Sequence, residues 1–313
     1  MSDTFTDIKK AVEGNAQSKQ LGTLMWWSLE GNRISHDDLT ITAIEKGLPK
    51  RYLPSEIKPH SAFKRAVRHS NTKLPNGHLI RTINDDRDEF VVGVVKENRD
   101  TAGKNLSYKV LSRVTFTKAT GHTSNDEDHS VVNEIYALYK QHLDHHTDDI
   151  RTMMTNFLKE SGVSIRPSGG VYFIPAVYQS VLDSLCEVVK SVSSSNRTYQ
   201  LRVFDTPESK QTLATVTQGS LEEEIRQIQD QLDKFVFEKA KETTLAKKLE
   251  GFEELRARAA MFASVLNFKT DEINQRIDKI KAVVQGHIVP KEPKEEKEDA
   301  LPTPKAYNSE AGF

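Results

Sequence analysis

The feature that most constrains the fold is a regular apolar seam in the last third of the chain. Between residues 221 and 284, apolar side chains recur at alternating steps of four and three, a spacing that keeps them on one stripe of a helix. The first part of this seam consists of Leu221, Ile225, Ile228, Leu232 and Phe235. A stripe of this length needs an apolar partner. We therefore predict a long α-helical module over 206–288, built as a coiled coil or a helical hairpin.

The sequence leaves the arrangement of this module open. The seam continues over 245–266, where one step slips, and over 273–284 after a restart at Thr270-Asp271. Two or three antiparallel helices and a dimerising coiled coil fit this pattern equally well. The helices can pack on their own chain or between chains, and spacing does not distinguish the two.

Two helix starts are indicated near the seam. Thr206 is a good N-cap followed by Pro207, and proline is favoured at the first helical position. Ser220 and Glu223 have the spacing of a capping box. We expect a helix to begin at each of the two places.

The body, residues 21–205, alternates strand-like and helix-like segments. Strands are predicted over 21–29, 79–83, 90–96, 108–117 and 199–204, with two short strands within 163–175. Helices are predicted over 37–46, 61–69 and 176–192, and as two helices or one bent helix within 131–158. The Gly-rich crossover loops of a doubly wound fold do not occur. The prediction is an α+β body with a mixed or antiparallel sheet, packed helices and a sub-boundary near 120–130.

Both ends of the chain differ from the body. Residues 1–20 are polar and are predicted to form a flexible arm. Residues 289–313 are charged, rich in proline and nearly free of apolar side chains, so they are predicted to be a disordered tail.

Composition limits the classes of protein to consider. The chain has 313 residues, of which 36% are hydrophobic and 28% charged, and no apolar run reaches the length of a membrane span. The N-terminus lacks the layout of a signal peptide, so a cytoplasmic location is expected. A formal net charge of −1 gives no global attraction to nucleic acid or membrane.

A local basic patch lies within residues 46–73. It holds eight lysines and arginines against Glu56 alone, and its candidate nucleic-acid ligands are Lys50, Arg51, Lys64, Arg65 and Arg68. Phosphates are the partners that such a surface attracts. The alternative is a solvated helix edge paired with the acidic residues of 85–89. No base-reading motif accompanies the charge.

A weaker candidate is a metal site formed by His142, His146 and Asp149. The two histidines are four residues apart and share a face on a continuous helix, where Asp149 can add a carboxylate. No Glu follows the first His in the metalloprotease arrangement. A pattern of this kind marks a solvated polar helix end more often than a metal site. No cofactor is therefore expected.

Three further residues bear on the core and on catalysis. Trp26 and Trp27 are adjacent, so in a strand they face opposite sides, and one of them needs cover from a helix or a partner. Cys186 lies in an apolar helical pattern and is predicted to be a buried structural thiol. No nucleophile elbow, phosphate loop, kinase motif or paired-cysteine motif occurs, so no catalytic residue is assigned.

Three segments together resemble an uncharacterised family of proteins from prokaryotes and their viruses. They are Gly22-Thr-Leu-Met-Trp-Trp-Ser28, the stretch from Tyr52-Leu-Pro54 to Ala62-Phe-Lys-Arg-Ala66, and Arg166-Pro-Ser-Gly-Gly-Val-Tyr-Phe-Ile-Pro175. The resemblance covers most of 21–205. It implies a phage or bacterial origin and carries no assigned catalytic residues.

Two hypotheses of function follow. The first is a non-enzymatic interaction or assembly protein that binds itself or another protein through its C-terminal helices, in a phage-related or defence-related complex. The alternative is a nucleic-acid-binding protein that uses the 46–73 patch.

Overall fold

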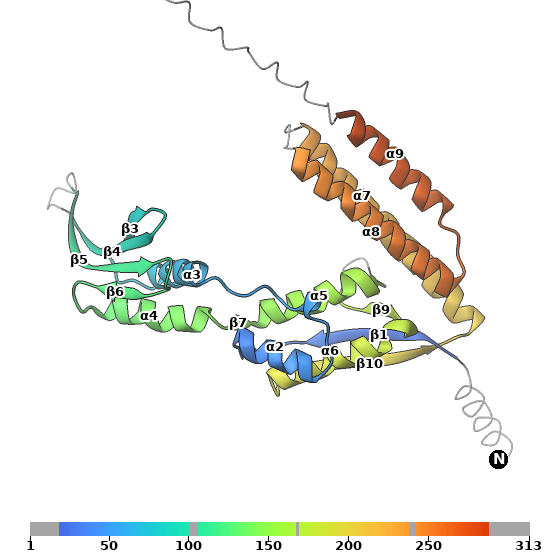
Figure 1. Ribbon diagram of the computed structural model, residues 1–313, viewed down its shortest axis with the longest axis horizontal. Helices are drawn as coiled ribbons and strands as arrows, with labels where there is room; N and C mark the ends of the chain where they lie inside the picture. The colour runs from blue at the N-terminus through green and yellow to red at the C-terminus, as the bar shows by residue number, and fades with distance from the viewer. Residues whose placement is uncertain (1–18, 100–105, 167–168, 238–241, 288–313) are drawn as a thin grey trace, which may run out of the picture.

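The protein is a mixed α+β chain with antiparallel sheets, organised as two lobes and a helical module (Figure 1). The computed structural model describes residues 19–99, 106–166, 169–237 and 242–287. Both predicted ends, 1–18 of the arm and the whole tail, lie outside the described residues. The fold class predicted for the body is confirmed.

The first lobe is built on a four-stranded antiparallel sheet in the order β10-β1-β9-β8. Its strands are β1 Gln20–Ser28, β8 Val163–Ser164, β9 Tyr172–Pro175 and β10 Arg197–Phe204. Its helices are α2 His36–Glu45, α5 Thr147–Ser161 and α6 Gln179–Val192, with the short turns η1 Lys50–Tyr52 and η2 Ala176–Tyr178.

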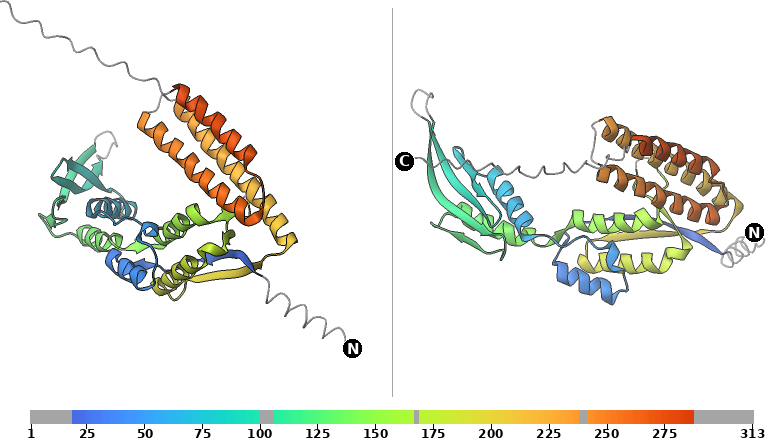
Figure 2. Two further views of the ribbon diagram at one scale, coloured as in Figure 1. Left: turned by 45° about the vertical axis from the view of Figure 1, so that its right-hand side comes forward. Right: turned by 45° about the horizontal axis from the view of Figure 1, so that its top comes forward.

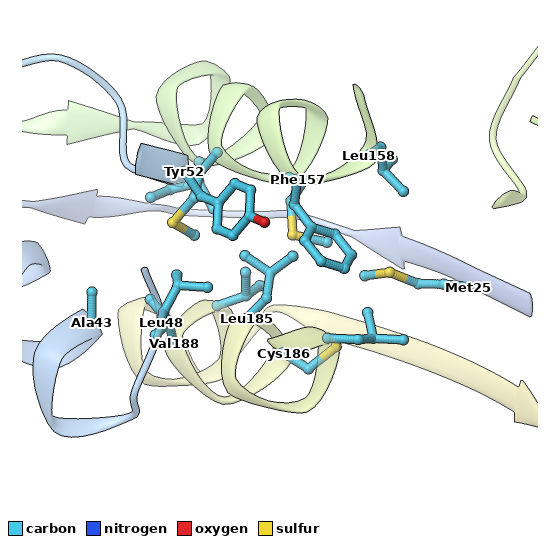
Figure 3. Close-up of a cluster of buried hydrophobic side chains, with 14 of the residues drawn as sticks. Met25, Ala43, Leu48, Tyr52, Phe157, Leu158, Leu185, Cys186 and Val188 are labelled. Atoms are coloured by element: carbon cyan, nitrogen blue, oxygen red, sulfur yellow. The ribbon is translucent and has the colours of Figure 1, made fainter. Parts of the chain in front are cut away.

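The helices of the first lobe cover one face of this sheet. Alternate residues of β1 and β9, including Met25 and Ile174, point into a core with Phe157 of α5 and Leu185 of α6 (Figure 3). Cys186 lies in the same core, where burial raises the pKa of its thiol, and it accepts a hydrogen bond from Gln200. The predicted buried thiol is confirmed.

The second lobe is inserted in the first, between η1 and α5. Its elements are α3 Pro59–Thr72, β3 His78–Asp85, β4 Glu89–Arg99, β5 Leu106–Thr117, β6 Thr123–Asn125 and α4 Ser130–His142. The strands form an antiparallel sheet in the order β3-β4-β5-β6, which joins the three predicted strands over 79–83, 90–96 and 108–117 as a meander and extends it by β6. Phe63 of α3 and Ile135 of α4 pack with Phe90 and Phe116 on one face of this sheet. The body therefore contains two separate apolar cores.

The lobes are joined by a small two-stranded pairing of β2, Arg33–Ile34, with β7, His145–His146. Arg33 also pairs with Asp144, with 2.6 Å between Nε and Oδ2. Because residues 145 and 146 take extended backbone to pair with β2, the helical pattern of 131–158 is divided into α4 and α5. Of the two predicted forms, two helices are observed.

The helical module consists of α7 Pro207–Phe237, α8 Glu242–Leu266 and α9 Asp271–His287, which lie side by side (Figure 2). Thr206 caps α7 as predicted, because its Oγ1 accepts a hydrogen bond from Ser209 N at 3.1 Å. The second predicted start, at Ser220 and Glu223, is wrong, because α7 runs through both residues. The buried residues Leu213 and Thr217 continue the four-residue steps of the seam N-terminally, so α7 carries one continuous buried stripe from Leu213 to Leu232.

The module docks on the face of the first sheet that the lobe's own helices leave free. Phe173 of β9 lies with Leu213 of α7 and with Phe262 and Leu266 of α8 in one buried cluster. A hydrogen bond also joins the module to the first lobe. The Arg258 guanidinium of α8 donates to the Lys159 carbonyl oxygen near the end of α5, at 2.8 Å. Among the described helices, none is long and apolar enough to cross a membrane.

Candidate interaction surfaces

The predicted seam is buried inside the chain. Leu221, Ile225 and Leu232 are at most 1% exposed and form one cluster with apolar residues of α8 and α9, and Ile228 packs beside them. The side chain of Phe235 lies outside the described part of the structure. The stripe that indicated association therefore has apolar partners on its own chain.

The predicted basic patch is divided between the two lobes, and part of it is neutralised. Arg51 makes a two-pronged contact with Glu160, at 2.9 and 3.0 Å, and this contact lowers the pKa of that carboxyl. Tyr52 donates its hydroxyl to the same carboxylate at 2.9 Å, and burial is the first cause that raises the pKa of Tyr52 to about 12. Arg51 thus ties η1 to α5.

In the rest of the patch, some basic side chains are paired with acidic residues and others are free to attract phosphate. Lys64 pairs with Asp85, at 2.7 Å between Nζ and Oδ2, as expected for a helix edge neutralised by the acids of 85–89. Arg65 and Arg68 are exposed on α3 and have no ion pair among the described residues. Lys50 is exposed on η1, in the other lobe. Of the five candidate ligands, Arg65 and Arg68 are the two that lie together on one element without an ion pair among the described residues.

The predicted metal ligands lie at the junction between α4 and α5, where His146 and Asp149 make hydrogen bonds to the backbone or from it. The backbone N–H of His146 donates to Asp149 Oδ2 at 2.9 Å, and His146 Nε2 lies 3.0 Å from the carbonyl oxygen of Gln141. His142 is 6.2 Å from His146 between ring centroids, and the pKa of His142 is lowered, chiefly by burial. No group of three or more His, Cys, Asp or Glu side chains in the described chain could hold a metal ion.

A pair formed by the buried His145 and the half-buried His36 lies next to this junction and was not predicted. His145 is fully buried in β7, with Nε2 3.0 Å from Nδ1 of His36 and Nδ1 3.6 Å from Asp149 Oδ2. Burial is the first cause that lowers the pKa of His145. The neutral ring suits this site, where it links α2 to the start of α5. Spacing could not single out His145, because its partner His36 is more than a hundred residues away.

The two tryptophans separate as predicted. Trp27 stacks on Tyr172, at 5.4 Å between ring centroids, and packs against the core of the first lobe. Trp26 points to the opposite face and stacks on Tyr199 of β10, also at 5.4 Å. Tyr199 and Leu201 are 43% and 57% exposed, and Trp26 is 36% exposed. These three side chains, here called the β10 patch, form an apolar surface that sequence reasoning located only at its tryptophan.

The β10 patch lies at an open edge of the sheet. β10 is the first strand in the order and pairs with β1 alone among the described strands. Leu24 pairs with Leu201 and Trp26 with Tyr199, so the patch spans two strands on one face. An edge strand presents unpaired backbone N–H and C=O groups, which are a template for pairing with another chain.

A pocket of about 380 Å³ lies where the module meets α5. Its charged lining residues are Lys159, Glu160, Glu254 and Arg258. Glu160 is held by Arg51 and Tyr52, and Arg258 pairs with Glu224 as well as with the Lys159 carbonyl. Glu160 and Arg258 are used in holding elements together, so we assign the pocket no chemistry.

The features above define a mixed α+β protein that pairs two lobes with a docked helical module and presents apolar and basic surfaces. Residues 20–296 match the model of a family of unknown function, DUF6744, and the chain belongs to this family. The match confirms the expectation of an uncharacterised family. Neither a curated protein nor a solved structure matches the chain.

Proposed function

We propose that this chain is a non-enzymatic assembly protein that associates with a second copy of itself through the β10 patch. The sequence hypothesis assigned the association to the C-terminal helices as a coiled coil. Burial of the seam within the chain favours the strand edge instead. The observation that carries the proposal is the exposed stack of Trp26 on Tyr199, continued by Leu201, on a strand with a free edge.

A second copy fits this edge by symmetry. Two antiparallel β10 strands related by a two-fold axis at Gln200 place Tyr199 of each chain opposite Leu201 of the other, on the same face. The two apolar patches then become one continuous surface. The same register places Arg202 opposite Thr198 and Arg197 opposite Val203, so no two arginines face each other. Such pairing would satisfy the free backbone groups of both edges.

The setting of this assembly is also a proposal. The three segments that resemble proteins of prokaryotes and their viruses support a phage-related or defence-related complex in a bacterial cytoplasm. The proposal assigns the chain no reaction.

The test is the solution mass of the full chain. A pair of chains is expected at twice 35.4 kDa by light scattering, with the mass falling on dilution. The variant Tyr199→Lys with Leu201→Lys should return the mass to one chain, because it places two charges on each side of the apolar contact. The matched control is Val177→Lys, which changes an apolar side chain that is 74% exposed on η2 and is not part of β10.

Three results would overturn the proposal. The first is a wild-type chain that stays at 35.4 kDa at every concentration, which would leave the patch to a different protein. The second is a pair of chains that survives in the Tyr199→Lys, Leu201→Lys variant. The third is an equal loss of association in the Val177→Lys control.

A further inference from the structure

A row of basic side chains crosses three strands of the second lobe. His78 of β3 pairs with Lys96 of β4, and Lys96 pairs with Lys109 of β5. Directly opposed residues of antiparallel strands share a face, with Cβ atoms about 4.5–5.5 Å apart. Both lysines are exposed, and neither has an ion pair among the described residues. Like charges directly opposite each other destabilise a sheet, so this row has a cost that a bound anion would remove.

The row lies just past the end of α3. Val94 lies two positions before Lys96 in β4, and its partner Ile80 lies two positions after His78 in β3, so the row continues the sheet face that α3 and α4 cover. The amide of Asn71, near the end of α3, accepts a hydrogen bond from Ile80 N at 2.8 Å. The row therefore follows directly on the C-terminal turn of α3. Beyond it, β4 and β5 continue as a two-stranded ribbon (Figure 2).

Several acidic groups of this lobe lie at the other end of the same strands, while Glu97, next to Lys96 in β4, points to the opposite face of the sheet. Asp85 and Asp86 close β3, roughly 23 Å from His78 at about 3.3 Å per residue. Asp85 is already held there by Lys118 and Lys64, whose hydrogen bonds lower its pKa to about 2. This separation exceeds the screening length of about 8 Å at physiological salt, so these acids do not neutralise the row.

The free arginines of α3 lie on the same side of the sheet as the row. Arg65 and Arg68 are exposed, and the charge of Arg65 contributes to the lowered pKa of His142 on α4. Four permanent cations, Arg65, Arg68, Lys96 and Lys109, thus line one side of the lobe. We call this the α3-ribbon surface.

We propose that the α3-ribbon surface binds the phosphate backbone of a nucleic acid, independently of base sequence. A line of lysines and arginines without acidic partners is the electrostatic footprint of phosphate binding. Base stacking is not part of the proposal, since Tyr108 pairs with Glu97 and so points to the opposite face from Lys109. Backbone contacts alone position a nucleic acid without reading its bases. The site is separate from the β10 patch, so the two proposals can fail independently.

The experiment measures binding of the full chain to a labelled DNA duplex and to an RNA duplex by fluorescence anisotropy, over a series of salt concentrations. The test variant is Lys96→Gln with Lys109→Gln, and the control is Lys50→Gln, which removes an exposed lysine from the first lobe. Each lost phosphate contact lowers the slope of log K against log salt by about 0.9. Two lost contacts should reduce the slope by about 1.8. Over a tenfold range of salt, the affinity of the variant should therefore change about 60-fold less than the affinity of the wild-type chain.

Folding of the variant has its own readout. Because the substitutions remove two facing like charges, the midpoint of thermal unfolding should stay the same or rise. A variant that binds more weakly while melting no earlier supports the surface. A second variant, Arg65→Gln with Arg68→Gln, should weaken binding through the other half of the surface.

The proposal fails if the wild-type chain binds neither duplex at low salt. It also fails if Lys50→Gln weakens binding as much as the double lysine variant, or if base sequence changes the affinity strongly. Binding to vesicles of anionic phospholipid, with none to either duplex, would assign the surface to a membrane and overturn the inference.

Discussion

Replacing Ile225 with alanine tests where the apolar seam has its partners. Ile225 is fully buried on α7 and belongs to the cluster formed with α8 and α9. Truncating a fully buried isoleucine to alanine costs about 2–5 kcal/mol, because the lost transfer free energy and the cavity add. We expect the free energy of unfolding of the helical module to fall by about 3 kcal/mol.

The assay is denaturant unfolding followed by circular dichroism, at two protein concentrations. It is best carried out in the Tyr199→Lys, Leu201→Lys background, so that strand association does not contribute. Since the seam is buried within one chain, the unfolding midpoint should not depend on concentration. If the seam were buried between two chains, a tenfold concentration change would shift the apparent stability by about 1.4 kcal/mol.

The control is Glu222→Ala, an exposed position on the same turn of α7. Its effect should stay within about 0.5 kcal/mol. The reasoning is refuted by an Ile225→Ala variant as stable as the parent, which would mean that the residue is not packed. It is equally refuted by a midpoint that rises with protein concentration in this background.

Two further predictions concern the first lobe. Gly22→Ala should lower the free energy of unfolding by about 1–3 kcal/mol, measured by denaturant unfolding, because an added Cβ would lie 2.3 Å from the Ile174 carbonyl oxygen and 2.5 Å from the Phe173 ring. Acidification should also destabilise the fold: the pKa of His145 is lowered in the folded chain, so the unfolded state binds more protons, and stability is lost as the pH falls through the ordinary value of 6.5. His60 and His142 shift in the same direction, so the slope of stability against pH between about 6.5 and 5 should be shallower, but not absent, in a His145→Gln variant.

Local periodicity predicted the elements of the body well. The alternating residues of β5 and the apolar steps of α4, α5 and α6 appear in the structure as strands and helices, because burial on one face imposes these periods. The capping signal at Ser220 was misleading for the same reason. Buried positions continue at four-residue steps through Leu213 and Thr217, and burial of that stripe outweighs a local start signal.

The candidate sites were harder to predict, because they depend on contacts between residues that are distant in the sequence. The 46–73 patch is contiguous in sequence, yet Glu160 neutralises Arg51 from a helix more than a hundred residues away. The row across β3, β4 and β5 is the opposite case, because Lys96 and Lys109 become neighbours only through the register of the sheet. The same holds for the stack of Trp26 on Tyr199.

The position of the helical module explains why the β10 patch is exposed. The sheet face that carries Leu24, Trp26 and Phe173 has no helix of its own lobe, and the module covers it only in part. Phe262 and Leu213 lie over Phe173, with Leu24 and Val203 at the margin of the contact. Trp26, Tyr199 and Leu201 continue the same face beyond that margin. The edge of the module contact thus defines the surface that is left for a partner. If the module undocked, the whole sheet face would be exposed and not only the β10 patch.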